Sequence, residues 1–274
     1  MDSEYPLLIK QILTKSSVMS FSQEIVSNPN VRLNYQEFTG RLGRLANSLT
    51  AMGISEKMRV GIMDWDTHRY LEYFFAVPMM GAVLHTINVR LSPKQVLYTI
   101  NHARPDLIIV HQDFMPLIEE LKLEFEREII IIPIGYGEKY EDWISSSSTS
   151  FNFPEFDENR TATLFYTTGT TGDPKGVTYS HRQLVLHTLG LLAGFGSFSG
   201  DSGLHRDDVY MPLTPLFHVH GWGFPYAATM LGLRQVYPNR YDPETILQLI
   251  DSEAVTFSHC VPTVLSMLLD HPNS

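Results

Sequence analysis

The chain has 274 residues, of which 43% are hydrophobic and 18% are charged, and its formal net charge is -10 at pH 7. This composition excludes a disordered chain and predicts a globular protein with a large core. The negative balance, without a basic cluster, argues against nucleic acid as a partner. No apolar run approaches the ~20 residues that cross a bilayer, and the acidic start at Met1 to Glu4 lacks a secretion signal. We therefore expect a cytoplasmic protein without a transmembrane segment.

Apolar residues in the first half of the chain alternate between helical and extended spacings. Asn34 followed by Glu37 predicts a helix start, and apolar side chains then recur every three or four residues until Gly53. Ser92 with Gln95 predicts a second capped helix, ending near 101. The other predicted elements are strands at 59–63, 82–85, 107–110 and 129–132 and a helix at 70–80. This alternation predicts an α/β fold with mostly parallel sheets sandwiched by helices.

A serine-rich stretch from 142 to 154 has no apolar period, which predicts a surface connection between two lobes. We therefore expect a first α/β lobe at 1–155 and a second at 156–274. The second half carries predicted strands at 164–166, 209–211, 235–237 and 255–259 and helices at 181–193, 222–231, 243–252 and 262–270. The single cysteine, Cys260, excludes an internal disulfide, and its apolar neighbours favour a buried, inert thiol.

The segment from Tyr166 to Gly176 reads Tyr-Thr-Thr-Gly-Thr-Thr-Gly-Asp-Pro-Lys-Gly and lies between a predicted strand and a predicted helix. Glycines let backbone N–H groups turn inward, hydroxyls add donors and the lysine adds a positive charge, so the segment suits a polyphosphate. Because Pro174 precedes Lys175 and Gly176 follows it, the segment departs from the P-loop of kinases and GTPases. The alternative is a threonine- and glycine-rich surface turn, which so long an ordered pattern disfavours.

This pattern resembles the signature of the acyl-adenylate-forming (ANL) superfamily, whose members include fatty-acyl- and aryl-CoA ligases. The resemblance implies that residues 167–175 hold the phosphates of ATP together with Mg2+. It implies further that Thr167 contacts the metal and that Lys175, a candidate catalytic residue, faces the pyrophosphate oxygens. The residues expected to bind the nucleotide are Thr167, Thr168, Gly169, Thr170, Thr171, Gly172 and Lys175.

A second segment, from Pro212 to Trp222, resembles the acid-binding motif of the same family. The resemblance implies that His218, a second candidate catalytic residue, lies beside the substrate carboxylate, where an imidazole can donate a hydrogen bond. It also implies that Trp222 lines or gates an acyl tunnel. The residues expected to bind the acid are His218, Val219, Gly221 and Trp222.

Plainer alternatives exist for the second segment. His218 and Trp222 could be an ordinary core histidine and a core aromatic. A zinc site at His218 and His220 would need a further ligand at suitable spacing, and none accompanies them. The tetrapeptide Gly200 to Gly203 resembles the nucleophile motif of trypsin-like proteases, but that fold is all-β and a polar loop explains it.

Resemblance to the ligases extends over nearly the whole chain, including Asn88 to Ser92 and 255–263, and residues 217–228 look most like medium- to long-chain fatty-acid ligases. In the implied reaction, a fatty-acid carboxylate attacks the α-phosphorus of ATP, pyrophosphate leaves, and the CoA thiolate then attacks the acyl-adenylate. The family also uses an adenine loop, a ribose aspartate and a lysine of a carboxy-terminal domain, none of which follows Trp222. We therefore expect a fragment of a protein about twice as long, which alone adenylates poorly or not at all.

Other functions stay open. An aryl-acid CoA ligase would use the same chemistry, whereas an amino-acid-activating domain would need an acidic residue for the substrate amine, whose usual location is missing here. A truncated, non-catalytic module could bind ATP or acyl groups without turning them over. Relatives often pair through the first lobe, so a homodimer is a further expectation.

Overall fold

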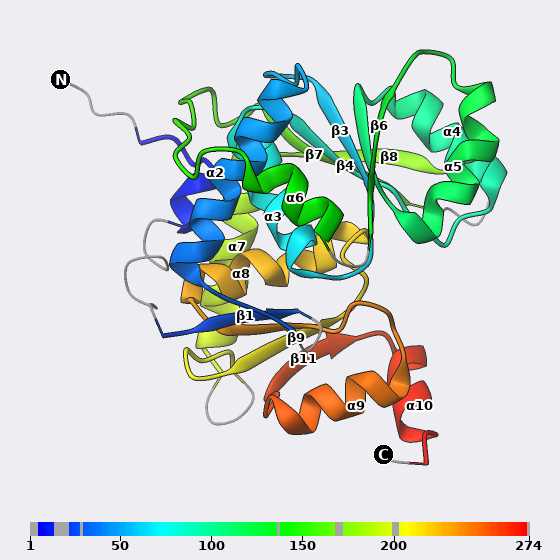
Figure 1. The fold of residues 1–274 in the computed structure, drawn as a ribbon. Coiled ribbons are helices and arrows are strands. Elements are labelled where there is room, and N and C mark those ends of the chain that lie inside the picture. The colour runs from blue at the N-terminus through cyan, green and yellow to red at the C-terminus, as the bar shows by residue number, and fades with distance from the viewer. Residues whose placement is uncertain are drawn as a thin grey trace. The chain divides into compact units, whose positions relative to one another are not determined.

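The computed structural model describes residues 5–13, 22–27, 30–135, 138–167, 172–198 and 203–272. Its contacts divide the chain into two compact units, each built on one β-sheet (Figure 1). The first unit comprises Met1–Ile9, Gly40–Asp64 and Glu72–Leu184. The second unit comprises Lys10–Thr39, Trp65–Leu71 and Val185–Ser274.

The first unit contains a six-stranded sheet in the order β6-β5-β3-β4-β7-β8. Neighbouring strands are parallel except for β7 and β8, which are antiparallel. The strands are β3 (Arg59–Met63), β4 (Val83–Thr86), β5 (Leu107–His111), β6 (Ile130–Ile134), β7 (Thr161–Thr167) and β8 (Lys175–Ser180). The helices that connect them are α3 (His68–Met79), α4 (Pro93–Ala103), α5 (Met115–Leu121) and α6 (Glu138–Ser145).

The helix starts that the sequence predicts are confirmed at both places. In α2 (Tyr35–Ala51) the Asn34 side chain accepts from the Glu37 backbone N–H and the Glu37 carboxylate accepts from the Asn34 N–H, so two donors of the first turn are satisfied. Ser92 and Gln95 form the same reciprocal pair at the start of α4. One face of α4, including Ile100, packs in a cluster with Ile108 of β5, as its apolar period predicts.

The second unit contains a five-stranded sheet in the order β11-β9-β10-β1-β2, parallel except for the pair β1 and β2. Its strands are β1 (Glu24–Ser27), β2 (Val31–Asn34), β9 (Val209–Leu213), β10 (Arg234–Tyr237) and β11 (Phe257–Cys260). Its helices are α7 (His181–Gly196), which begins in residues of the first unit, α8 (Phe224–Leu231), α9 (Pro243–Ser252) and α10 (Pro262–Leu269).

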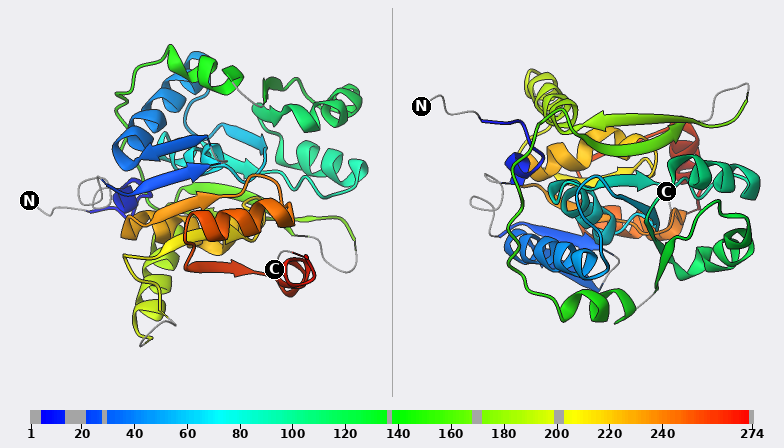
Figure 2. Two further views of the ribbon diagram at one scale, coloured as in Figure 1. Left: turned by 60° about the horizontal axis from the view of Figure 1, so that its bottom comes forward. Right: turned by 90° about the horizontal axis from the view of Figure 1, so that it is seen from above.

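The core of the second unit joins sheet and helices. Val26, Met211 and Val236 from three strands cluster with Ile246 of α9 and Val264 of α10, and Figure 2 shows α9 lying along the strands. Cys260 is partly buried against this cluster, so the expected thiol packs on the core without being fully enclosed by it.

The expected α/β class, with mostly parallel sheets and helices, is confirmed, but several elements escaped prediction. Strands β1 and β2 are missing from the sequence-based series because the partner of β1 is β10, some 210 residues later, with Val26 opposite Val236. Helix α6 overlaps the stretch from 142 that was expected to be a connection. Its Tyr140 and Ile144 are buried at a helical spacing of four.

The division into units also differs from the predicted boundary between 155 and 156. Strand β7 pairs in parallel with β4, with Thr163 opposite Leu84, so residues 156–184 belong to the first unit. Residues 10–39 belong to the second unit, because β1 and β2 complete its sheet. Sheet pairing between distant segments sets these limits, and the serine-rich stretch does not. In the described part of the chain, no helix combines the length and apolarity that crossing a membrane requires.

Candidate functional site

The threonine- and glycine-rich segment forms the connection of a β-hairpin. Strands β7 and β8 are antiparallel, and Thr167 at the end of β7 pairs directly with Lys175 at the start of β8. The expected step from strand to helix was wrong, because β8 intervenes before α7. Four residues expected to bind the nucleotide lie outside the described residues, so their role stays a prediction: Thr168, Gly169, Thr170 and Thr171.

The residues at the two described ends of this connection differ in backbone conformation and in exposure to solvent. Gly172 has a φ of +109°, and a Cβ there would meet nothing within 4 Å, so the backbone conformation and not crowding requires glycine. Pro174 is buried, whereas Lys175 is exposed and has no ion pair with another described residue. Thr167 is partly buried. Thr167 and Lys175 are therefore cross-strand partners at the end of the described hairpin, which we call its mouth.

Below the mouth, the hairpin is held by an aromatic cluster of the first unit. The Tyr166 hydroxyl lies 2.7 Å from His102 Nδ1 of α4, and its ring centroid lies 5.4 Å from that of His85 on β4. Burial raises the pKa of Tyr166 to about 12 and, with the nearby Arg59 charge, lowers the pKa of His85 to about 3. Gly176 lies close to the Tyr166 ring, where a Cβ would come within 3.4 Å. This cluster therefore anchors the end of β7, beside the signature segment, to the rest of the first unit.

The chemistry of the described hairpin residues suits an anion more than a metal cage. Thr167 offers one hydroxyl oxygen, and Mg2+ characteristically completes its shell with phosphate oxygens and water. Within the described ranges, no group of three or more His, Cys, Asp or Glu residues could hold a metal ion. A magnesium ion at Thr167 therefore fits only if a bound phosphate and water supply most of its ligands.

The acid-binding segment forms an unusual turn in the second unit. Residues 219–223 all have positive φ, and three of them are not glycine: Val219 at 48°, His220 at 54° and Trp222 at 56°. Each such residue costs roughly 1–2 kcal/mol in the left-handed region, and a β-branched valine is an outlier there. A turn of this kind persists only where surrounding contacts impose it, and such strain often accompanies functional sites.

Asp66 supplies part of that support. One of its carboxylate oxygens accepts from the Leu216 backbone N–H at 3.1 Å, and the other accepts from the Tyr241 hydroxyl at 2.7 Å. On the far side, His187 Nε2 of α7 lies 3.1 Å from the Trp222 carbonyl oxygen. Contacts therefore hold the chain both just before the turn, at Leu216, and near its end, at Trp222.

Trp222 and His218 are the accessible side chains of this turn. Trp222 is 44% exposed, and its ring stacks on that of His259, with centroids 5.9 Å apart and planes at 22°. His218 is also exposed, whereas His220 is buried and burial lowers its pKa to about 3. Exposure weighs against the core alternatives for His218 and Trp222. The indole is therefore held by His259 and still presents apolar surface to solvent.

His259, which sequence analysis left without a role, organises the same region. Its Nε2 lies 3.0 Å from the Tyr210 hydroxyl and its Nδ1 lies 3.0 Å from Thr214 Oγ1, and its ring stacks on Phe224 with centroids 4.5 Å apart. Burial lowers the pKa of His259 to about 4, so the imidazole is neutral at pH 7. A signal did exist, because the carboxyl ends of the parallel strands β9 and β11 meet at one edge of the sheet.

The structure thus gathers the predicted site residues into two groups. Thr167, Gly172 and Lys175 flank the hairpin mouth of the first unit. Val219, Gly221 and Trp222 lie in the left-handed turn of the second unit, and His218 immediately precedes it. Asp66 and His187, which position that turn, carry no sequence signal of their own. In the protease-like tetrapeptide, Gly200, Asp201 and Ser202 lie outside the described residues.

The chain is 38% identical, over its full length, to a long-chain-fatty-acid–CoA ligase of Thermus thermophilus, and the match covers 51% of that protein. It is 36% identical over 97% of its length to a 3-methylmercaptopropionyl-CoA ligase of Ruegeria lacuscaerulensis, again covering 51% of the relative. The chain therefore spans about half the length of the curated relatives it matches.

Among solved structures, an anthranilate CoA ligase in complex with anthranoyl-AMP superimposes with a TM-score of 0.87 at 23% identity. That match covers 99% of this chain and 52% of the ligase, and it supports the fold alone. The sequence profile of the family described as AMP-binding enzyme matches residues 17–274. The chain accordingly belongs to the AMP-binding enzyme family and represents its amino-terminal part.

Proposed function

We propose that the chain is the amino-terminal portion of an ATP-dependent acid:CoA ligase that acts on a medium- or long-chain fatty acid. The observation that carries the proposal is the β7–β8 hairpin, in which Thr167 and Lys175 face each other across the mouth of the family's signature segment. In the reaction, a carboxylate oxygen bonds to the α-phosphorus of ATP as the bond to pyrophosphate breaks. The CoA thiolate then bonds to the acyl carbon as AMP leaves.

The hairpin would serve the leaving pyrophosphate. Lys175 is exposed and unpaired with other described residues, so its ammonium can approach an anion without first breaking an ion pair. Preformed donors around developing charge lower a barrier more than the same donors in water, because they need no reorganisation. Mg2+ bound to the phosphates would add further positive charge, and the Thr167 hydroxyl is the described oxygen best placed to contact it.

The left-handed turn would serve the acid. The exposed His218 imidazole can donate a hydrogen bond to a carboxylate, and the exposed part of the Trp222 indole offers apolar surface to the carbon chain. Because the two motifs belong to different units, their joint action on one acyl-adenylate is part of the proposal. A cytoplasmic location and pairing of two copies are expectations that accompany it.

The choice of a fatty acid rests on the amino-acid sequence of residues 217–228 and on the similarity to the long-chain-fatty-acid–CoA ligase of Thermus thermophilus. An aryl or a short sulfur-containing acid is the second candidate, because relatives named for such acids match this chain with similar coverage. A panel of acids with the full-length protein would separate them. A preference for decanoate or longer acids over benzoate and 3-methylmercaptopropionate supports the fatty-acid class, and the reverse order refutes it.

The first test concerns nucleotide binding by this chain itself. Titration calorimetry with ATP and Mg2+ should show binding that Lys175→Ala weakens about tenfold, the loss expected for one charge-assisted contact. Lys139→Ala on α6 removes an equal charge from an exposed position and should leave the affinity unchanged. Equal affinities for Lys175→Ala and Lys139→Ala would contradict the assignment of the hairpin.

The second test separates a ligase fragment from a non-catalytic binding module. With hydroxylamine as the trap for an acyl-adenylate, this chain alone should release little pyrophosphate and form little hydroxamate. Addition of the missing half should restore both if the chain is part of a ligase. Binding of ATP without hydroxamate in the full-length protein would favour the non-catalytic alternative.

A further inference from the structure

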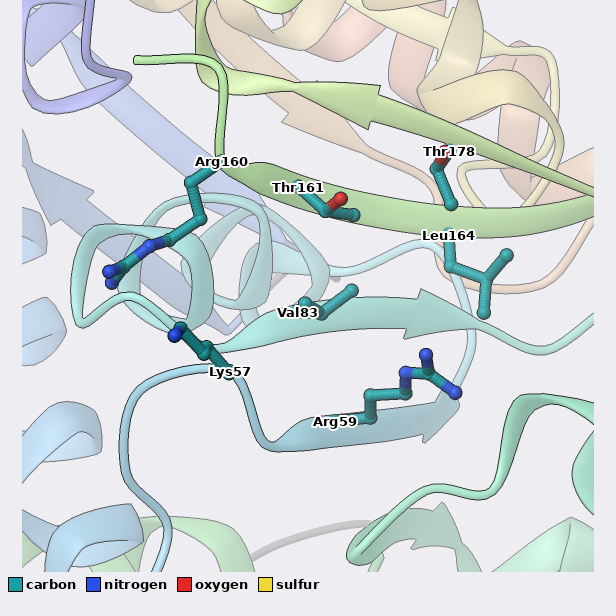
Figure 3. Close-up of a pocket in the computed structure, with 7 residues that line it drawn as sticks. All are labelled: Lys57, Arg59, Val83, Arg160, Thr161, Leu164 and Thr178. Carbon is teal, nitrogen blue, oxygen red and sulfur yellow. The ribbon is translucent and has the colours of Figure 1, made fainter. Parts of the chain in front are cut away.

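An open cavity of about 330 Å3 lies in the first unit (Figure 3). Three of its lining residues are cationic, namely Lys57, Arg59 and Arg160, and two are hydroxyl residues, Thr161 and Thr178. Such a gathering is notable in a chain whose net charge is -10. A concave surface lined by one sign of charge concentrates ions of the opposite sign.

The cavity is separate from the phosphate hairpin although it uses the same two strands. Thr161 begins β7 and Thr178 lies in the second half of β8, whereas the hairpin mouth is the pair Thr167 and Lys175. Six residues of extended chain separate Thr161 from Thr167, which amounts to about 20 Å along the strand. The cross-strand pair Leu164 and Thr178, which also lines the cavity, lies three residues, about 10 Å, from the mouth. The cavity is therefore a different place on the same two strands.

The cations keep donors available for a ligand. The Arg160 guanidinium pairs with Glu56 through Nη1 at 2.6 Å and lies over the Phe156 ring, which holds it in place while its other N–H groups remain. The Lys57 side chain has no ion pair or hydrogen bond with another described residue, and the residue is exposed. Among the described residues, Glu56 is the carboxylate that forms a salt bridge with one of these three cations.

Arg59 is fixed more deeply. Its guanidinium donates to the Ala103 carbonyl oxygen at the end of α4, and its backbone N–H donates to Asp106 at 2.8 Å. The Asp106 carboxylate is itself paired with Arg127 at 2.8 Å. The fold therefore holds the positive charge of Arg59 in place, and no carboxylate in the described part of the chain forms a salt bridge with its guanidinium.

The arrangement of the charges indicates the shape of the ligand. In Figure 3 the head groups of Lys57 and Arg160 lie on one side of Val83, and the Arg59 guanidinium lies on the other. Val83 and Leu164 supply an apolar surface between them. We infer that this cavity is a second anion-binding site, for a small phosphorylated molecule of the diphosphate class whose charged groups reach both ends.

The test uses inorganic pyrophosphate as the probe and the backbone amides of the 15N-labelled chain as reporters. Shifts at Thr161 and Thr178 report the cavity, and shifts at Thr167 and Lys175 report the hairpin, so the two sites titrate independently in one experiment. The double variant Lys57→Gln with Arg160→Gln should weaken binding at the cavity about tenfold, from two exposed charge contacts. It should leave binding at the hairpin unchanged.

Lys139→Gln is the matched control, and Lys175→Ala should show the opposite pattern, with weaker binding at the hairpin and unchanged binding at the cavity.

Because Arg160→Gln also breaks the pair with Glu56, Thr178→Val serves as a variant that keeps every cation, and it should weaken binding at the cavity by about threefold. The inference is overturned if Thr161 and Thr178 do not shift while pyrophosphate is saturating. It is equally overturned if the double variant titrates like Lys139→Gln. If only the amides of Thr167 and Lys175 fail to shift with pyrophosphate, the result counts against the proposed ligase function and not against this site.

Discussion

The β7–β8 hairpin and the left-handed turn at 219–223 both carry candidate site residues, but their backbone conformations are stabilised differently. The hairpin uses glycine in open space: a Cβ at Gly172 would meet no atom within 4 Å. The turn uses non-glycine residues at positive φ and is clamped by Asp66 and His187. The conformation at Gly172 is therefore set by its own backbone, whereas the shape of the turn depends on contacts from other segments. Changes at the turn should consequently affect stability, and changes at the hairpin should affect binding.

The largest effect is expected from removing the clamp. Asp66→Ala leaves the Leu216 N–H and the Tyr241 hydroxyl without their acceptor, and the unfolding free energy should fall by about 3 kcal/mol. Urea denaturation followed by circular dichroism measures it. Asp173→Ala, an exposed change on the hairpin, should stay within about 0.5 kcal/mol of the parent. Equal losses for the two variants would erase the contrast between the regions.

Two glycines with positive φ sharpen the comparison. A Cβ at Gly223 would lie 2.6 Å from the His187 ring, whereas one at Gly172 meets nothing. Gly223→Ala should therefore cost about 2–3 kcal/mol of unfolding free energy, from strain and overlap together. Gly172→Ala should cost about 1 kcal/mol, from the backbone conformation alone. The same urea experiment decides it, and a larger loss for Gly172→Ala would be inconsistent with the two environments.

His85, at the base of the hairpin, predicts how the stability of the protein depends on pH. The folded pKa of His85 is lowered to about 3 by burial, so the unfolded state binds the proton first as the pH falls. Stability should be fully present above about pH 6.5 and should decline below it, by about 2 kcal/mol at pH 5 for this residue. His85→Phe keeps an aromatic ring beside Tyr166 and should make that decline shallower. The decline does not vanish, because the folded pKa is also lowered to about 3 in His181 and His220 and to about 4 in His259. An unchanged slope in His85→Phe would contradict the assignment.

The smallest effect on stability is expected at Lys175, although its effect on binding is large. The exposed side chain has no ion pair with another described residue, so Lys175→Ala should change the unfolding free energy by less than about 0.5 kcal/mol. Thermal unfolding checks this in the protein used for calorimetry. A drop of several kcal/mol would mean that the lysine stabilises the hairpin itself, and reduced ATP binding could then not be assigned to a lost contact.

Local patterns were sufficient where neighbours in sequence supply the contacts. The starts of α2 and α4 followed from Asn34 with Glu37 and from Ser92 with Gln95, because these bonds span only three residues. Strand β8 was missed because its apolar signal is weak: all of its residues are at least partly exposed. The strain at Val219 was also invisible, since nothing in its neighbours in sequence announces a left-handed valine.

By itself, the sequence determined the alternation of helices and strands, the family signature from Tyr166 to Gly176, and the presence of His218 and Trp222 in one short segment. Period, caps and motif order are properties of adjacent residues and can be recognised in a linear chain. Only the tertiary structure decided that β1 belongs beside β10, that the signature closes a hairpin, and that Asp66 and His259 support the turn. These depend on pairing and burial between segments far apart in the chain, where many alternative partners satisfy the same local pattern.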